Sequence, residues 1–338
     1  MTAANGNGNG HAAATRPLHT GIYSPLVTPF DANEEIDYKA WEQHVVRVAG
    51  AGVGLVVMGT NGEASHLSTE ERSQLVAAAR KSLDAAGLGE TPIIAGAGVG
   101  SIKETVRNCK EAAQAGADAV IVITPGYFAG ALTNNRAAIK EFFVAVADAS
   151  PIPVMMYNFP ACASGIDLDS DLLIDISQHP NICGAKLTCA MIGKGARIVD
   201  AVQRPGFLIV TGFADILLPS MMVGLDGTIC GTANIAPRVC VKLYNLIKDA
   251  RANKDWAKLE EAQELQKIVS KADWVLFKGA IGGTKWALDR FYYPVGQPRR
   301  PLQPAGKEAQ QMLEDNLKEI MALERQLEKA AGVTVAKA

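Results

Sequence analysis

The stretch of sequence that decides the fold is Asn181-Ile182-Cys183-Gly184-Ala185-Lys186. It is a short apolar run that ends in a lysine, and such runs are typical of strands buried on both faces of a parallel sheet. A lysine carried inward on a strand must be paired or neutral, and a neutral amine is a nucleophile that can form a Schiff base with a ketone. The alternative is a strand-end lysine whose amine reaches solvent.

Seven further runs of the same kind are found along the chain, and each is followed by a segment of helical periodicity. Their starts recur every roughly 20 to 38 residues, which is typical of repeated strand–helix units. The eight runs are Gly21–Val27, Gly54–Met58, Pro92–Gly96, Ala119–Thr124, Val154–Tyr157, Ile182–Lys186, Phe207–Thr211 and Thr228–Thr232.

Eight such units predict an α/β fold, a (β/α)8 TIM barrel with a C-terminal helical extension. A doubly wound open sheet is the alternative. It is disfavoured because no G-x-G-x-x-G turn follows the first strand. We expect a disordered leader over residues 1–17, the barrel over 18–251, a helical region over 252–331 and a frayed tail over 332–338.

The expected helical region contains a polar helix over Asp255–Ser270, a more apolar segment over Trp274–Arg290 and a charged helix over Lys307–Lys329. Apolar residues lie along one side of the last helix. Packing of this stripe onto the parent barrel is the favoured interpretation, and a subunit contact is the alternative. The stripe consists of Leu313, Leu317, Ile320, Met321, Leu323 and Leu327.

The composition of the chain limits the classes of binding partner and the cellular compartment that we expect. The 338 residues carry a net charge of -2, with 48% hydrophobic and 20% charged residues, so neither nucleic acid nor an anionic membrane surface is expected as a partner. No apolar stretch reaches the ~18 residues of a membrane span. Residues 1–15 lack the apolar core of a secretory signal, so the cytosol is the expected compartment. The six cysteines form no C-x-x-C pair, and we expect neither a metal site nor a cofactor.

In a (β/α)8 barrel, the active site lies at the carboxyl ends of the strands. The residues found there are Thr60 and Asn61 after the second run, Tyr127 after the fourth, Tyr157 at the end of the fifth, Lys186 at the end of the sixth, Gly212 after the seventh and Ile229 within the eighth. Cys162 and Cys189 also fall near this predicted site.

These residues suit carbonyl chemistry through an imine of a 2-oxo acid. Lys186 needs a pKa near ~7.5 instead of ~10.4, which burial can supply. A tyrosine can shuttle protons if a nearby cation or hydrogen bonds lower its pKa, and backbone N–H groups of a Gly-Thr-Asn-Gly turn can hold a carboxylate. Taken singly, Tyr157 can be a core tyrosine, Thr60-Asn61-Gly62 an ordinary turn and Tyr127 a surface aromatic.

Three motifs, Gly59-Thr60-Asn61-Gly62-Glu63, Tyr157-Asn158-Phe159-Pro160 and Gly184-Ala185-Lys186, together resemble the dihydrodipicolinate synthase/N-acetylneuraminate lyase superfamily of class I aldolases. The opening Pro25-Leu26-Val27-Thr28-Pro29-Phe30 resembles its first strand.

The resemblance implies specific roles for the site residues. Lys186 is then the Schiff-base lysine, Tyr157 the proton shuttle, and Thr60 and Asn61 the carboxylate ligands, with Gly212 and Ile229 beside the substrate. Thr60 links Tyr157 to Tyr127, and Tyr127 comes from a neighbouring subunit. A homotetramer built as a dimer of dimers is therefore expected.

Within the superfamily, the synthase branch usually places an arginine shortly after the tyrosine motif, and Ala161-Cys162-Ala163-Ser164-Gly165 contains none. With Gly165-Ile166-Asp167-Leu168-Asp169-Ser170, the motifs look most like 2-keto-3-deoxy-L-galactonate aldolases of D-galacturonate breakdown, which release pyruvate and L-glyceraldehyde. The alternatives are a 4-hydroxy-2-oxoglutarate aldolase, a related lyase or dehydratase, and a barrel that binds metabolites without catalysis. A substrate with a second carboxylate calls for an extra cation, and the strand ends show no obvious one.

Overall fold

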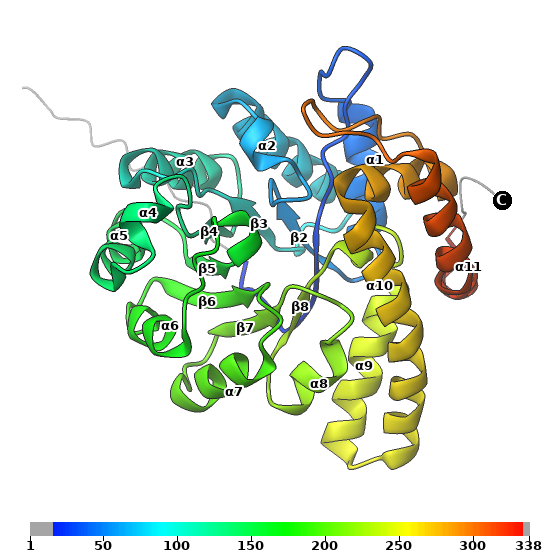
Figure 1. Ribbon diagram of the computed structural model, residues 1–338. Helices are drawn as coiled ribbons and strands as arrows, with labels where there is room; N and C mark the ends of the chain where they lie inside the picture. Colours follow the sequence, from blue (N-terminus) through cyan, green and yellow to red (C-terminus); the bar gives the residue numbers. More distant parts are fainter. Residues whose placement is uncertain (1–15, 334–338) are drawn as a thin grey trace, which may run out of the picture.

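A computed structural model describes residues 16–333 and shows eight parallel strands closed into a barrel (Figure 1). The strands are β1 (Gly21–Pro25), β2 (Gly54–Val57), β3 (Ile93–Gly96), β4 (Ala119–Ile123), β5 (Val154–Asn158), β6 (Ile182–Leu187), β7 (Leu208–Thr211) and β8 (Gly227–Ile229). Closure is made by β1 and β8, where Gly21 pairs with Gly227. The predicted TIM barrel is thus confirmed, and the open-sheet alternative is wrong.

The strands separate two apolar clusters. Alternate side chains of each strand point to opposite faces, so Met155 and Tyr157 lie inside the barrel while Val154 and Met156 pack outward against the helices. Inside the barrel, Tyr23 fills the space around Gly54, and its hydroxyl donates to the carbonyl of His19. The interior is therefore a packed core beneath the strand ends.

The helices that follow the strands begin where polar caps occur in the sequence. Ser68 forms a capping box with Glu71 at the start of one helix, and the Ser101 hydroxyl accepts the N–H of Glu104 at the start of another. The long helix that follows β4 begins at Arg136, after a short extra helix over Ala129–Leu132. These helices are α1 (Tyr38–Ala49), α2 (Thr69–Ala85), α3 (Ile102–Gln114), α4 (Ala129–Leu132), α5 (Arg136–Ala149), α6 (Ser170–Ser177), α7 (Ile192–Ala201) and α8 (Leu217–Met222).

Three more helices lie together on one side of the barrel (Figure 1): α9 (Pro237–Asn253), α10 (Trp256–Phe291) and α11 (Lys307–Ala330). The two segments expected before the proline-rich connector form one long α10, broken at Ala280, whose φ is 51° and ψ is -154°. The apolar stripe of α11 packs against α9 and α10 of the same chain, as the favoured interpretation holds.

The amino-terminal boundary differs slightly from the expected one. Arg16 was placed in the leader, yet its backbone N–H donates to the Asp118 carboxylate at the base of β4. The rest of the expected leader and residues 334–338 of the expected tail lie outside the described residues. Within residues 16–333, no helix is both long enough and apolar enough to cross a membrane.

Candidate active site

Strand register brings the two central side chains of the site to one level. In the pairing of β5 with β6, Tyr157 lies opposite Lys186. Both side chains point into the barrel, and the Lys186 Nζ lies 4.3 Å from the centre of the Tyr157 ring. Tyr157 and Lys186 therefore lie at adjacent strand ends, as predicted from the sequence.

Lys186 is only 5% exposed. Burial lowers the pKa of its amine from 10.5 to about 7, and the neighbouring Cys230 and Cys162 thiols oppose this shift only in part. No salt bridge to Lys186 is found among the described residues. Because desolvation disfavours the charged form, a large share of the amine is neutral near pH 7, and it can act as a nucleophile there.

Tyr157 differs from the expected proton shuttle in one respect. Burial raises the pKa of its phenol well above the usual value, and the hydrogen bond with Thr60 opposes that shift only weakly. A lowered pKa was expected, but burial of the phenol outweighs the hydrogen bonds that favour its ionised form. Tyr157 therefore starts as a protonated phenol, able to give a proton before it takes one.

Thr60 and Asn61 lie on the turn that follows β2. The Thr60 Oγ1 is 3.3 Å from the Tyr157 hydroxyl, which is the first link of the expected proton relay. Gly62 leaves the turn room, since a Cβ at this position would lie 2.9 Å from the carbonyl oxygen of Leu26. Thr60 and Asn61 thus reach the mouth of the barrel from the side opposite β6.

A cavity of about 230 Å³ opens above Lys186. Thr60, Asn61, Gly212 and Ile229, the predicted substrate-binding residues, all line it. Gly212 is required by close packing, because a Cβ there would lie 2.0 Å from the Thr188 Oγ1. The predicted residues of this chain, Tyr127 excepted, therefore gather around one small cavity.

Sequence reasoning missed Thr188 and the wall supplied by α10. Thr188 lies two residues beyond Lys186, so the inward alternation of β6 was the signal that could have identified it. Thr188 is buried and lines the cavity, and its hydroxyl is a second group, after that of Thr60, that opposes the rise in the Tyr157 pKa. Ala280, Ile281 and Thr284 form the α10 wall.

Asp273 of α10 is a further buried polar residue of this wall. Its carboxylate accepts the Thr232 hydroxyl and the backbone N–H groups of Ala214 and Asp215. Burial nevertheless raises its pKa from 3.8 to about 6. Asp273 thus joins α10 to the loops after β7 and β8.

A second cavity of about 290 Å³ adjoins the first and shares Thr60, Tyr157 and Cys162 with it. Tyr127 does not reach either cavity within its own chain: it is 92% exposed and contacts the ring of Phe128 edge-on, with 5.0 Å between ring centres. The expected Thr60–Tyr127 link is therefore not made within a single subunit.

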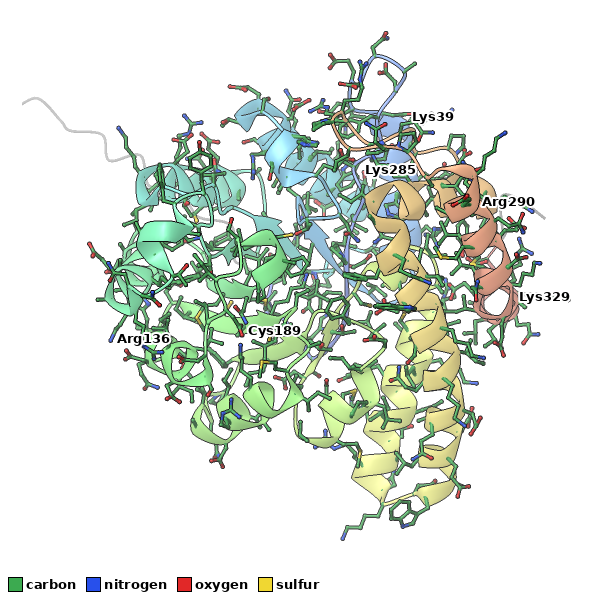
Figure 2. The ribbon with its side chains drawn as sticks, viewed as in Figure 1. Lys39, Arg136, Cys189, Lys285, Arg290 and Lys329 are labelled. Carbon is green, nitrogen blue, oxygen red and sulfur yellow. The ribbon has the colours of Figure 1, made fainter. Side chains whose placement is uncertain are left out.

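All six cysteines are free thiols, and two of them, Cys162 and Cys189, were expected near the site. Cys162 lines both cavities, whereas Cys189, labelled in Figure 2, is absent from the lining of either one. Within the described part of the chain, no three His, Cys, Asp or Glu side chains gather in a way that would hold a metal ion.

Comparison with known proteins places the chain in a family. Residues 18–320 match the dihydrodipicolinate synthetase family, and the chain belongs to it. The resemblance read from the three motifs is thus confirmed.

Relatives of known name cover nearly the whole chain. A protein of Emericella nidulans named "Probable 4-hydroxy-2-oxoglutarate aldolase, mitochondrial" is 44% identical over 93% of this chain and 99% of its own length. A protein of Hypocrea jecorina named "L-threo-3-deoxy-hexylosonate aldolase" is 42% identical over 92% of this chain and 98% of its own. A crystal structure of a dihydrodipicolinate synthase family protein from Coccidioides immitis has 34% identity and a TM-score of 0.80, covering 92% of this chain and 99% of the other.

Proposed function

We propose that this member of the dihydrodipicolinate synthetase family is a class I aldolase that cleaves 2-keto-3-deoxy-L-galactonate to pyruvate and L-glyceraldehyde in the breakdown of D-galacturonate. The observation that carries the proposal is the buried Lys186, which lies beside the phenol of Tyr157, has a pKa of about 7 and has no salt bridge among residues 16–333. The name of the Hypocrea jecorina relative supports this substrate.

The proposed reaction begins with attack of the neutral Lys186 amine on the ketone carbon of the substrate. The ketone oxygen takes one proton from the attacking nitrogen and a second from Tyr157, leaves as water and gives a protonated imine. The resulting phenolate then takes the proton of the C4 hydroxyl. The C3–C4 bond breaks, its electron pair moves into the imine to form an enamine, and the aldehyde is released.

The cycle closes when the enamine carbon C3 takes a proton and water hydrolyses the imine. Pyruvate leaves, and Lys186 is free again. In this sequence, the raised pKa of Tyr157 fits its part, because a strong phenolate base is formed only after the phenol has given up its proton. The Thr60 hydroxyl, 3.3 Å away, steadies the phenol and the phenolate in turn.

The charged residues of the cavity favour one candidate substrate over the other. Among the described residues that line it, Lys186 and Asp273 are the charged ones. After imine formation, no lysine or arginine of this lining is free to hold a second carboxylate. A neutral hydroxyaldehyde product therefore suits the cavity better than glyoxylate, whose carboxylate would face Asp273.

Cleavage of 4-hydroxy-2-oxoglutarate is the second candidate, because the Emericella nidulans relative carries that name and is 44% identical. The same relative is named mitochondrial, so the cytosolic location expected from the sequence stays a prediction.

Oligomerisation is part of the proposal. Tyr127 is exposed, and the second cavity opens beside Thr60 without it. The tyrosine of a neighbouring subunit would complete the relay from Tyr157 through Thr60 to solvent. Such an exchange needs at least a dimer, and a dimer of dimers is the proposed assembly.

A substrate panel tests the function. Purified protein is given 2-keto-3-deoxy-L-galactonate, its C4 epimer and 4-hydroxy-2-oxoglutarate, and pyruvate release is measured. We expect the highest kcat/KM on the first compound. A higher kcat/KM on 4-hydroxy-2-oxoglutarate would transfer the assignment to the second candidate, and no pyruvate from any of the three would reject both.

A further inference from the structure

The turn that carries Thr60 and Asn61 is held in an unusual backbone conformation. Met58 and Glu63, at its two ends, have φ values of 58° and 56°, in the left-handed region that L-residues rarely adopt. Such conformations persist only where the surrounding structure holds them. The turn therefore needs an anchor beyond its own short hydrogen bonds.

The anchor is the carboxylate of Glu63. Both Glu63 and Lys285 have side chains that are 0% exposed, and the Lys285 Nζ lies 2.7 Å from Oε1 of Glu63. The other oxygen, Oε2, accepts the backbone N–H of Arg299 at 2.8 Å and lies 3.3 Å from the His66 Nδ1. Groups from distant parts of the chain thus converge on one carboxylate.

Lys285 in turn lies on α10, the helix that supplies the opposite wall of the cavity, but does not itself line the cavity. Figure 2 labels it on α10, near the connector that leads to α11. Its amine also donates to the carbonyl of Gln297 at 3.1 Å and lies 4.3 Å above the ring of Phe30. One helical turn before it on α10 lies Ile281, which lines both cavities, and the preceding residue, Ala280, breaks the helix.

We propose that the buried Glu63–Lys285 ion pair is a positioning element for catalysis, which sets the Thr60–Asn61 turn at a fixed distance from the α10 wall and so holds the Thr60 hydroxyl against Tyr157. The proposal rests on the proposed aldolase function. Neither residue of the pair lines the cavity above Lys186, although Glu63 lines the second cavity next to Thr60. Both residues therefore act on the cavity above Lys186 through Thr60 and Asn61.

General physical chemistry favours a positional role over a purely stabilising one. Two charges lose their hydration when buried, and replacing a buried pair by apolar side chains of similar size is often neutral or stabilising. Such a replacement loses a fixed position, because the ionic contact with Lys285 and the backbone N–H of Arg299 hold the Glu63 carboxylate in one place. A displacement of about 1 Å at a reacting group can lower the rate about 10²-fold.

Three variants test the proposal: Glu63→Gln, Lys285→Met and the double variant. Each single variant leaves one polar group buried without its partner and should lower the melting temperature. The double variant removes both charges and should recover most of that loss. Its kcat/KM should nevertheless stay about 10²-fold below that of the wild type.

Changes in kcat and KM of the folded variants distinguish a positioning role from a loss of protein stability. Displacement of Asn61 should raise KM for the oxo acid, and displacement of Thr60 should lower kcat, in a protein that is fully folded by circular dichroism. A double variant with wild-type melting temperature and wild-type kcat and KM would overturn the proposal. If the double variant does not fold, Lys285→Arg keeps the charge, and wild-type kinetics with this longer, planar cation would likewise overturn it.

The Arg80–Asp118 pair provides a matched control. It is also buried, with 2.7 Å between the Arg80 Nη2 and the Asp118 Oδ2, but it lies at the base of β4, away from the cavity. Arg80→Met should lower stability without changing kcat or KM of the folded protein. Trapping of the pyruvate imine by borohydride in all variants separates the two proposals: trapping in the wild type supports the imine chemistry whatever the positioning variants show.

Discussion

Lys186 and Lys285 are both buried at the mouth of the barrel, yet their surroundings make them chemically different. Lys285 faces the Glu63 carboxylate at 2.7 Å and the carbonyl of Gln297, and burial lowers its pKa only to about 8, because Glu63 opposes the shift. Lys186 faces the ring of Tyr157 and the thiols of Cys230 and Cys162, and its pKa falls to about 7. Burial alone therefore does not make a nucleophile; burial without a carboxylate partner does.

The largest expected effect separates the two lysines directly. Lys186→Met should abolish pyruvate release, whereas Lys285→Met should leave measurable turnover. Stability should change in opposite directions. Removal of the unpaired amine should raise the free energy of unfolding, and removal of one partner of the buried pair should lower it by about 3–5 kcal/mol. Urea unfolding of both variants measures the difference.

Mass spectrometry after borohydride reduction with pyruvate gives an independent check on this contrast. A three-carbon adduct is expected on Lys186 in the wild type and on no residue in Lys186→Met. An adduct on Lys285 would show that the paired amine also reacts, and the distinction between the two lysines would fail.

A smaller effect is expected from the proton relay that serves Lys186. Tyr157→Phe keeps the ring but removes the proton carrier, so kcat should fall by about 10²–10⁴-fold with little change in stability. Tyr127→Phe should cost less, because water can partly replace a distal relay. If subunits exchange this tyrosine, inactive Lys186→Ala chains co-refolded with Tyr127→Phe chains should be more active than either parent. Mixed oligomers without that gain would assign Tyr127 to its own barrel or to no role.

The contrast between the two lysines also shows what could be predicted from the sequence. Lys186 ends an apolar run, which favoured a buried position but left open an amine that reaches solvent. The order of the strands then placed it next to Tyr157. Lys285 lies in a helix with mixed polar and apolar residues, and its partner Glu63 is far away in the chain. Such a pairing between distant residues leaves no trace in the local periodicity of the sequence.

The direction in which the Tyr157 pKa is shifted was predicted wrongly for a related reason. A tyrosine next to a lysine suggests a cation and hence a lowered pKa. In the structure, the phenol is deeply buried, and the loss of hydration outweighs its hydrogen bonds, so its pKa is raised instead. Protonation states depend on the whole surroundings of a group, which strand order and residue type do not specify.

The last expected effect is a pH dependence that belongs to Lys186. Its pKa is about 7 in the folded protein, against a usual value of 10.5. Between these values, the unfolded chain binds more protons than the folded one, so stability should rise with pH by up to about 1.4 kcal/mol per unit. Below pH 7 both states are protonated, and this contribution should become flat.

Lys285 should also make the free energy of unfolding rise with pH above about pH 8, because its pKa is lowered as well. The quantity to measure is therefore the difference in the free energy of unfolding between the wild type and Lys186→Met, in which Lys285 is common to both. That difference should climb from pH 7 to pH 10 in favour of the wild type, while kcat/KM of the wild type climbs up to about pH 7 and then levels off. A difference that stays constant over this range would mean that Lys186 remains charged in the folded protein, and a charged amine could not begin the reaction proposed for it.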